Sequence, residues 1–282
     1  MVATISMVTG QGVSVQVVPE QDQYLPSESL ILKVRITNDA GQNLVLGKDD
    51  EWLNFTVENV EHFVVARLGA VPVRGEFTLE PSTTGTKKVD IAPYFELTRP
   101  GRYSVTALVN LPQWGQTVQS KAVSFDIIKG SSVWEKEFGV PPAEKQADAQ
   151  PEFRRYALVE TLHSKTLKLY FRLTDTREDR VFRIFPLGPM VAFSNLEPQM
   201  DRFSNLHVLY QSGGRTFIHC LINPDGLLLG RETYEYDDTR PALRAQPDGR
   251  IKVVGGKRRV TATDVPPPVN PTSPLDAKTD QP

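Results

Sequence analysis

The chain has 282 residues, a length typical of about two domains, and its formal net charge at neutral pH is −2. This near-balance excludes a strongly basic surface of the kind that binds nucleic acid, so we expect no nucleic-acid partner. The single cysteine, Cys220, excludes an internal disulfide and therefore the disulfide-stapled class of secreted scaffolds.

Residues 1–12 form the first predicted segment, which is an N-terminal arm or the remnant of a signal peptide. Their apolar run is interrupted by Thr4 and Ser6 and has no basic residues before it, so it is neither a complete signal peptide nor a transmembrane helix. Apolar residues that run into small ones resemble the end of a signal peptide. We therefore expect an extracytoplasmic bacterial protein, periplasmic or secreted, that does not span a membrane. A polar arm on a cytoplasmic protein is the alternative.

Apolar and polar residues alternate in several short stretches between residues 13 and 129. A period of two predicts strands that bury one face, and turn signals recur at roughly 8–12 residue spacing, which is typical of a two-layer sandwich. The predicted strands cover residues 13–17, 30–36, 52–57, 63–66, 76–79, 87–91, 102–109 and 122–127.

Pro100 and Gly101 form a predicted turn directly before Tyr103, which opens the most regular of these strands. A Tyr two residues after a turn Gly resembles the tyrosine corner of immunoglobulin-like sandwiches, in which the phenol packs inward and its hydroxyl bonds to the backbone upstream. The resemblance implies an immunoglobulin-like β-sandwich over residues 13–129. The paired Cys and the central Trp of antibody domains are absent, so the chain is closer to the disulfide-free bacterial domains.

Two segments have polar and proline-rich compositions that predict little burial. Residues 130–152, with Pro141 and Pro142 among Ala, Glu, Lys and Gln, are predicted to be a linker. Residues 261–282 are predicted to be a disordered, Pro-rich tail.

Residues 153–260 are predicted to form a second, smaller antiparallel β-domain. Matching Leu167 with Leu206 indicates two units at an offset of roughly 40 residues, and these units resemble blades of bacterial β-propellers. A ring typically needs about four blades or more, so a small open sheet or partial barrel is the alternative. The whole chain is thus predicted to be all-β. The predicted strands cover residues 155–159, 167–173, 181–185, 206–211, 215–222, 227–229 and 232–234.

His207 and Cys220 are the one predicted reactive pair. If Gly213 and Gly214 form a two-residue hairpin turn, His207 lies directly opposite Cys220. A thiol beside an imidazole is the arrangement of a Cys nucleophile and its base. A small apolar thiol beside a half-buried imidazole is the favoured interpretation, because no third orienting residue or oxyanion loop is visible. The four histidines are scattered, so we predict no metal, no cofactor and no catalytic residue.

Tyr170, Tyr234 and Tyr236 are the candidate ligand surface of the second domain. Aromatic side chains on a strand face can bind a sugar or a peptide. Packing between this sheet and the sandwich is the alternative, and the one that we favour.

These features predict a non-enzymatic extracytoplasmic module for binding or structure, serving adhesion, scaffolding or envelope-associated interaction. Its partner is expected to be another protein or a surface glycan. The alternative is a carbohydrate-binding or ligand-binding propeller-like protein that completes its ring by oligomerising. An enzyme built around His207 and Cys220 is the third hypothesis.

Overall fold

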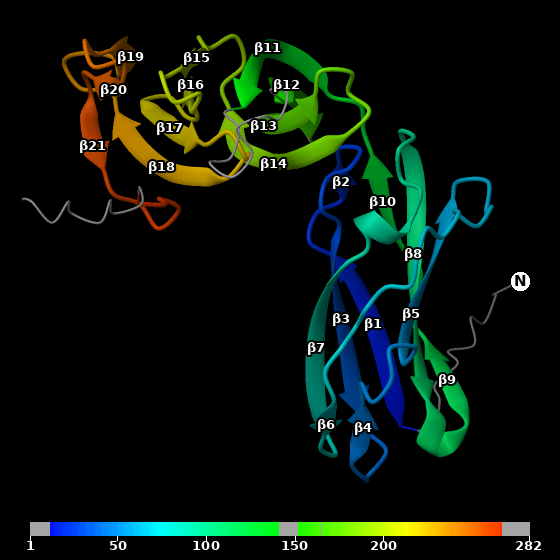
Figure 1. Cartoon of the computed structure of the whole chain (residues 1–282). Coiled ribbons are helices and arrows are strands. Elements are labelled where there is room, and N and C mark those ends of the chain that lie inside the picture. The colour runs from blue at the N-terminus through cyan, green and yellow to red at the C-terminus, as the bar shows by residue number, and fades with distance from the viewer. Residues whose placement is uncertain (1–11, 141–151, 164, 267–282) are drawn as a thin grey trace, which may run out of the picture. The chain divides into compact units, whose positions relative to one another are not determined.

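The computed structural model describes residues 12–140, 152–163 and 165–266, and it confirms the all-β prediction. The chain divides into two compact units, residues 1–130 and 131–282, each of which contains several antiparallel sheets (Figure 1). Regular helix in the described ranges is limited to two short 3-10 turns, and none of it is long and apolar enough to cross a membrane.

The described residues of the first unit form ten strands and both 3-10 turns. In chain order these are β1 (Val13–Pro19), β2 (Gln23–Tyr24), β3 (Ile31–Asn38), β4 (Leu44–Leu46), β5 (Leu53–Asn59), β6 (Phe77–Leu79), β7 (Thr83–Asp90), η1 (Ala92–Tyr94), β8 (Gly101–Leu111), η2 (Pro112–Trp114), β9 (Gln116–Gln119) and β10 (Val123–Ile127).

Two sheets of the first unit bury one common hydrophobic core. One sheet has the order β1-β3-β7, and the other has the order β2-β10-β8-β5 with β9 added to β8. Alternation along each strand sends one face inward, as in β1, where Val13, Val15 and Val17 are buried and the residues between them are exposed. The result is the two-layer sandwich that the alternating pattern predicts.

The second unit contains eleven described strands. They are β11 (Ser131–Val140), β12 (Glu152–His163), β13 (Thr166–Asp175), β14 (Val181–Met190), β15 (Glu197–Met200), β16 (Leu206–Gln211), β17 (Thr216–Ile222), β18 (Leu228–Glu235), β19 (Ala242–Ala245), β20 (Ile251–Val254) and β21 (Lys257–Arg259).

The strands of the second unit form two larger antiparallel sheets and one hairpin. The sheets have the orders β11-β12-β13-β14 and β15-β16-β17-β18-β21, and they share one core that includes Phe171 and Val208. The other face of the five-stranded sheet packs through Leu209 and Phe217 against Leu243 and Ile251 of the β19-β20 hairpin. No closed sheet or propeller is seen in the part of the chain that the structure describes. The two predicted units also do not correspond strand by strand. Leu167 lies on β13, the third strand of its sheet, whereas Leu206 lies on β16, the second strand of its sheet.

Three predicted boundaries differ from the structure or lie outside it. Residues 131–140 of the expected linker form β11, an edge strand paired with β12, while residues 141–151 lie outside the described ranges. Residues 261–266 of the expected tail are ordered against β18, and residues 267–282 are not described. The expected N-terminal arm, apart from Gly12, also lies outside the described residues.

Candidate functional site

Tyr103 is the residue for which the sequence predicts a structural role at the start of the most regular strand. Its side chain is buried in the core of the first unit, and its hydroxyl donates to the carbonyl oxygen of Arg99 at 2.8 Å. Gly101 is already the first residue of β8, and it does not have a positive φ, so the chain enters the strand through a bend and not through a tight glycine turn. The hydroxyl bond therefore ties the start of β8 to the residues just before it.

The predicted pair of His207 and Cys220 is wrong, because the hairpin register differs by one residue. The structure pairs Val208 with Cys220 and His207 with Leu221. A two-residue turn would leave an even number of residues between any two paired residues, but five residues separate the paired Gln211 and Phe217. A shift of one residue moves a side chain to the opposite face of a sheet. His207 and Cys220 consequently lie on opposite faces of the five-stranded sheet.

Cys220 is a fully buried thiol in the core shared by the two sheets of the second unit. Burial raises the pKa of this thiol to about 12, although the neighbouring Arg231 acts in the opposite direction. The thiolate is the nucleophilic form of cysteine, so this side chain behaves as a small apolar core residue.

The partner of His207 is a second histidine, which the sequence analysis missed. Nδ1 of His207 lies 3.1 Å from Nε2 of His219, and the two imidazole rings are 18° from parallel. Carboxylates lie at both ends of this pair: Oδ2 of Asp201 is 3.5 Å from Nε2 of His207, and Oε2 of Glu232 is 3.4 Å from Nδ1 of His219. Both histidines and Asp201 are largely buried. Only the correct register brings the two histidines to one face, so spacing alone could not reveal this row.

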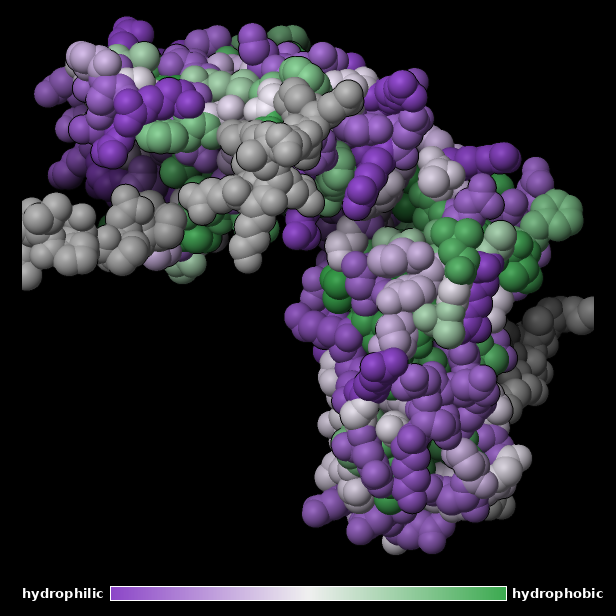
Figure 2. All heavy atoms as spheres, viewed as in Figure 1, coloured by the Kyte–Doolittle hydropathy of each residue, from purple (hydrophilic) through white to green (hydrophobic). Residues whose placement is uncertain are grey.

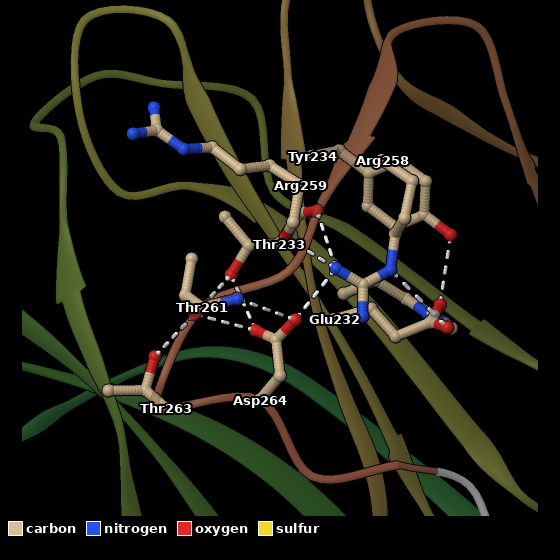
Figure 3. Close-up of polar contacts among 9 residues, drawn as sticks. Glu232, Thr233, Tyr234, Arg258, Arg259, Thr261, Thr263 and Asp264 are labelled. Atoms are coloured by element: carbon tan, nitrogen blue, oxygen red, sulfur yellow. Dashed lines mark hydrogen bonds and ion pairs between the residues drawn. The ribbon is translucent and has the colours of Figure 1, made fainter.

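A second polar cluster extends from Glu232 to the chain segment after β21. In Figure 3 the guanidinium of Arg258 lies between the carboxylates of Glu232 and Asp264. Asp264 accepts hydrogen bonds from the hydroxyls of Thr233 and Thr261 at 2.7 and 2.8 Å and from Nη1 of Arg258 at 2.7 Å. Burial acts to raise the pKa of Asp264, but these hydrogen bonds together outweigh it and lower the pKa to about 2. The cluster is therefore charged and fully paired, and it holds residues 261–266 against β18.

The three tyrosines predicted to form a ligand surface do not form one. Tyr170 is only 2% exposed and belongs to the interior of the second unit. The hydroxyl of Tyr234 donates to Oε2 of Glu232 at 2.9 Å, within the polar cluster. Tyr236 is exposed, and the guanidinium of Arg215 lies over its ring. Tyr170 and, in part, Tyr234 are thus packed within the second unit.

An exposed apolar segment follows β5 in the first unit. We define the apolar segment as residues 60–68, of which Val60, Phe63, Val64 and Leu68 are 65% to 69% exposed. Figure 2 shows hydrophobic residues gathered at this end of the first unit. The predicted strand at residues 63–66 is reduced here to an isolated bridge between Glu58 and Val64. Large apolar side chains concentrated in this way are typical of interaction surfaces.

The backbone of the apolar segment is held in place although its side chains are exposed. The amide of Val65 donates to the carbonyl oxygen of Val57 at 2.8 Å, and the amide of Leu68 donates to that of Tyr94 at 2.9 Å. The side-chain oxygen of Asn59 accepts from the amides of Glu61 and Phe63, which fixes the turn between them. A surface that is ordered in advance loses less conformational entropy when a partner binds.

Within the described ranges, no group of three or more His, Cys, Asp or Glu side chains is arranged to hold a metal ion.

Comparisons with known proteins give little further information. No family model matches the chain, and no curated protein matches it. Among solved structures, the chain is similar to the sporulation control protein Spo0M from Bacillus subtilis, with a TM-score of 0.31 and 10% sequence identity. The match covers 62% of this chain and 91% of that chain. A TM-score this low supports no conclusion about the fold or the function of this chain.

Proposed function

We propose that the chain is a non-enzymatic binding module whose partner is another protein, and that the apolar segment contacts this partner. The observation that supports the proposal is the exposure of four large apolar side chains within nine residues of an ordered backbone. Burying such side chains against a partner stabilises a complex by roughly 1.5–3 kcal/mol each before the costs of association. Phe63 is the expected centre of the contact, because aromatic residues are enriched in interface cores.

We also propose that the first unit is an immunoglobulin-like sandwich. Its strands β1, β3 and β7 take the places of strands A, B and E of that fold, and β5, β8 and β10 take those of C, F and G. The hydroxyl of Tyr103, near the start of β8, donates to the backbone four residues upstream, as the tyrosine of that corner does. Domains of this architecture commonly serve adhesion and scaffolding, which fits a module that presents a surface.

An extracytoplasmic location is a proposal that rests on the sequence of residues 1–12 alone. Fractionation of the source cells would test it, with the protein expected in the periplasm or the medium. Recovery of the protein only from the cytoplasm would contradict it.

The binding proposal can be tested by photo-crosslinking from the full-length chain. A photoreactive phenylalanine analogue at position 63 is expected to crosslink to a discrete protein in extracts of the source cells. The same analogue at position 193 is the matched control, because Phe193 is exposed as well but lies outside the apolar segment. The partner identified in this way is then purified without the crosslink. It should bind the Phe63→Ser chain at least about tenfold more weakly than the wild-type chain, a difference of about 1.4 kcal/mol in binding free energy.

Two results would contradict the proposal. The same proteins could be captured from positions 63 and 193, or the purified protein could bind the Phe63→Ser chain as tightly as the wild-type chain. Binding of a surface glycan that survives Phe63→Ser would support the glycan alternative from the sequence analysis in its place.

A further inference from the structure

One row of side chains crosses a face of the five-stranded sheet of the second unit: Asp201, His207, His219 and Glu232. The number of protons on the two imidazoles limits how many hydrogen bonds this row can form. The row has three contacts, one between the imidazoles and one from each imidazole to a carboxylate. Each contact needs one ring proton, because an ionised carboxylate only accepts and two imidazoles share one proton. Two neutral imidazoles carry two ring protons in total. One of the three contacts must therefore lack its proton while both rings are neutral.

The contact that lacks its proton is inferred from the distances and from the hydrogen-bond partners of each ring nitrogen. The contacts of His219 to Glu232 and of His207 to His219 are within hydrogen-bond distance. Nε2 of His207 is different, because it is buried and has no hydrogen-bond partner, although Oδ2 of Asp201 is only 3.5 Å away. The two protons of the neutral pair thus lie on Nδ1 of His219, toward Glu232, and on Nδ1 of His207, toward His219. Nε2 of His207 then presents a lone pair to the carboxylate.

We propose that the two histidines form a site for a single proton, which binds at Nε2 of His207 between this imidazole and Asp201. With that proton in place, all three contacts of the row are hydrogen bonds and one positive charge lies between two carboxylates. A second added proton has no place on the two rings, because it would require both ring nitrogens of the imidazole–imidazole contact to be donors. The two rings therefore share one site for an added proton.

The charged and titratable groups around the row determine how readily the proton enters. They come from each element next to the pair: Glu197 on β15, Asp201 in the β15–β16 turn, Glu232 and Tyr234 on β18, Arg258 on β21, and Arg240 before β19, whose guanidinium lies over Phe217. Of these, Asp201 is the group within ion-pair distance of Nε2 of His207. Burial lowers the pKa of His207 to about 4, His219 adds to this effect, and Asp201 opposes it. The site is consequently empty at neutral pH and fills in acid.

Filling the site affects one turn of the second unit in particular. Oδ1 of Asp201 accepts from the amides of Phe203 and Asn205, and its Oδ2 accepts from the side-chain amide of Asn205. A proton on Nε2 of His207 adds a charge-assisted hydrogen bond to the same carboxylate. Acid therefore links β16 to the β15–β16 turn by a bond that is absent at neutral pH.

Nitrogen NMR of the full chain, with histidine labelled in the ring nitrogens, tests the proposal. At pH 7 we expect protons on Nδ1 of both His207 and His219 and a bare Nε2 on His207. On acidification, Nε2 of His207 should gain a proton while Nε2 of His219 remains without one. Asp201→Asn should lower the midpoint by about one pH unit, because it removes the facing charge. Asp248→Asn, which changes an exposed turn aspartate, should leave the midpoint unchanged.

Several results would overturn the proposal. A proton on Nε2 of His207 at pH 7 would do so, even if the chain unfolds before the acid titration is complete. Independent titration of the two rings, each with a midpoint near that of free histidine, would do so as well. A His207 signal that changes on addition of a chelator or of zinc would assign the place between His207 and Asp201 to a metal ion and not to a proton.

Discussion

Buried tyrosines in this protein use their hydroxyls to tie a strand to a neighbouring stretch of backbone. Tyr103 donates to the carbonyl oxygen of Arg99, and Tyr156 in the second unit donates to that of Ser204 at 3.0 Å. Each ring fills the core while its hydroxyl donates to a backbone carbonyl. The same residue type therefore contributes both apolar burial and the position of a turn.

Tyr103→Phe should lower the free energy of unfolding of the first unit by about 1 kcal/mol. The ring remains, but the carbonyl of Arg99 loses its hydrogen bond. Urea denaturation followed by a signal from the first unit measures the effect. Tyr94→Phe is the control, because Tyr94 packs against the same core from η1 and is only partly buried. An unchanged stability in Tyr103→Phe would show that the hydroxyl bond contributes nothing.

The second unit should lose stability as the pH falls from about 6.5 to about 4. The pKa of His207 is lowered by burial to about 4 from its ordinary value of 6.5, so the unfolded chain takes up this proton before the folded chain does. Stability is thus complete above pH 6.5, and it falls by up to about 3 kcal/mol before the dependence levels off below pH 4. His207→Gln should remove this part of the slope, whereas His62→Gln at an exposed position should keep it. Urea denaturation at a series of pH values measures the pH dependence of stability in both variants. If stability falls equally steeply with pH in His207→Gln and in the wild type, His207 is not the group responsible.

The fate of Cys220 and His207 shows which part of a site a sequence pattern can and cannot predict. Alternation correctly places both residues in neighbouring strands of a hairpin. The faces, however, depend on the length of the turn at Gly213 and Gly214, and one residue of difference exchanges Cys220 for His219 as the neighbour of His207. Turn geometry depends on backbone conformations that two adjacent glycines do not specify.

At the scale of elements, the predictions succeed where burial is one-sided and fail where a segment is held by distant contacts. The alternating patterns of β1, β3 and β8 are confirmed, because each of these strands has one face in a core. β11 escapes prediction because it is an edge strand in which Phe138 is the one buried side chain. Residues 261–266 escape it because their order depends on Thr233 and Arg258, whose contacts do not show in the local composition.

Asp264→Asn should release residues 261–266 from β18. The neutral amide cannot form the ion pair with Arg258 and accepts fewer hydrogen bonds than the carboxylate does. The amides of Arg231 and Val265, each of which donates to the other residue's carbonyl, should then exchange with solvent faster, by about tenfold for each 1.4 kcal/mol of lost stability.

Hydrogen exchange measured by NMR on the full chain reports these two amides directly. Asp238→Asn, in the exposed turn after β18, is the control and should leave them unchanged. Unchanged exchange of Arg231 and Val265 in Asp264→Asn would show that the backbone bridge, and not the carboxylate, holds the segment.

At the scale of the whole molecule, the two units have separate hydrophobic cores. The core of the first unit runs from Val13 to Ile127, and the core between the two larger sheets of the second unit runs from Phe138 to Ile222, with no buried residue in common. The division between the two units falls at residue 130, because β11 pairs with β12 and joins the second unit. Separate cores imply separate cooperative units of unfolding.

Leu32→Ala and Leu173→Ala should therefore each destabilise one unit and leave the other unchanged. Both side chains are fully buried, one in each core, and removing a buried Leu side chain costs about 2–5 kcal/mol. Hydrogen exchange read by mass spectrometry on the intact chain resolves the two units peptide by peptide. Leu32→Ala should accelerate exchange in β1, β3 and β8 but not in β13 or β17, and Leu173→Ala should do the reverse. If Leu32→Ala accelerated exchange in both units equally, folding of one would depend on the other, and the apolar segment could then be tested only in a chain that keeps both cores intact.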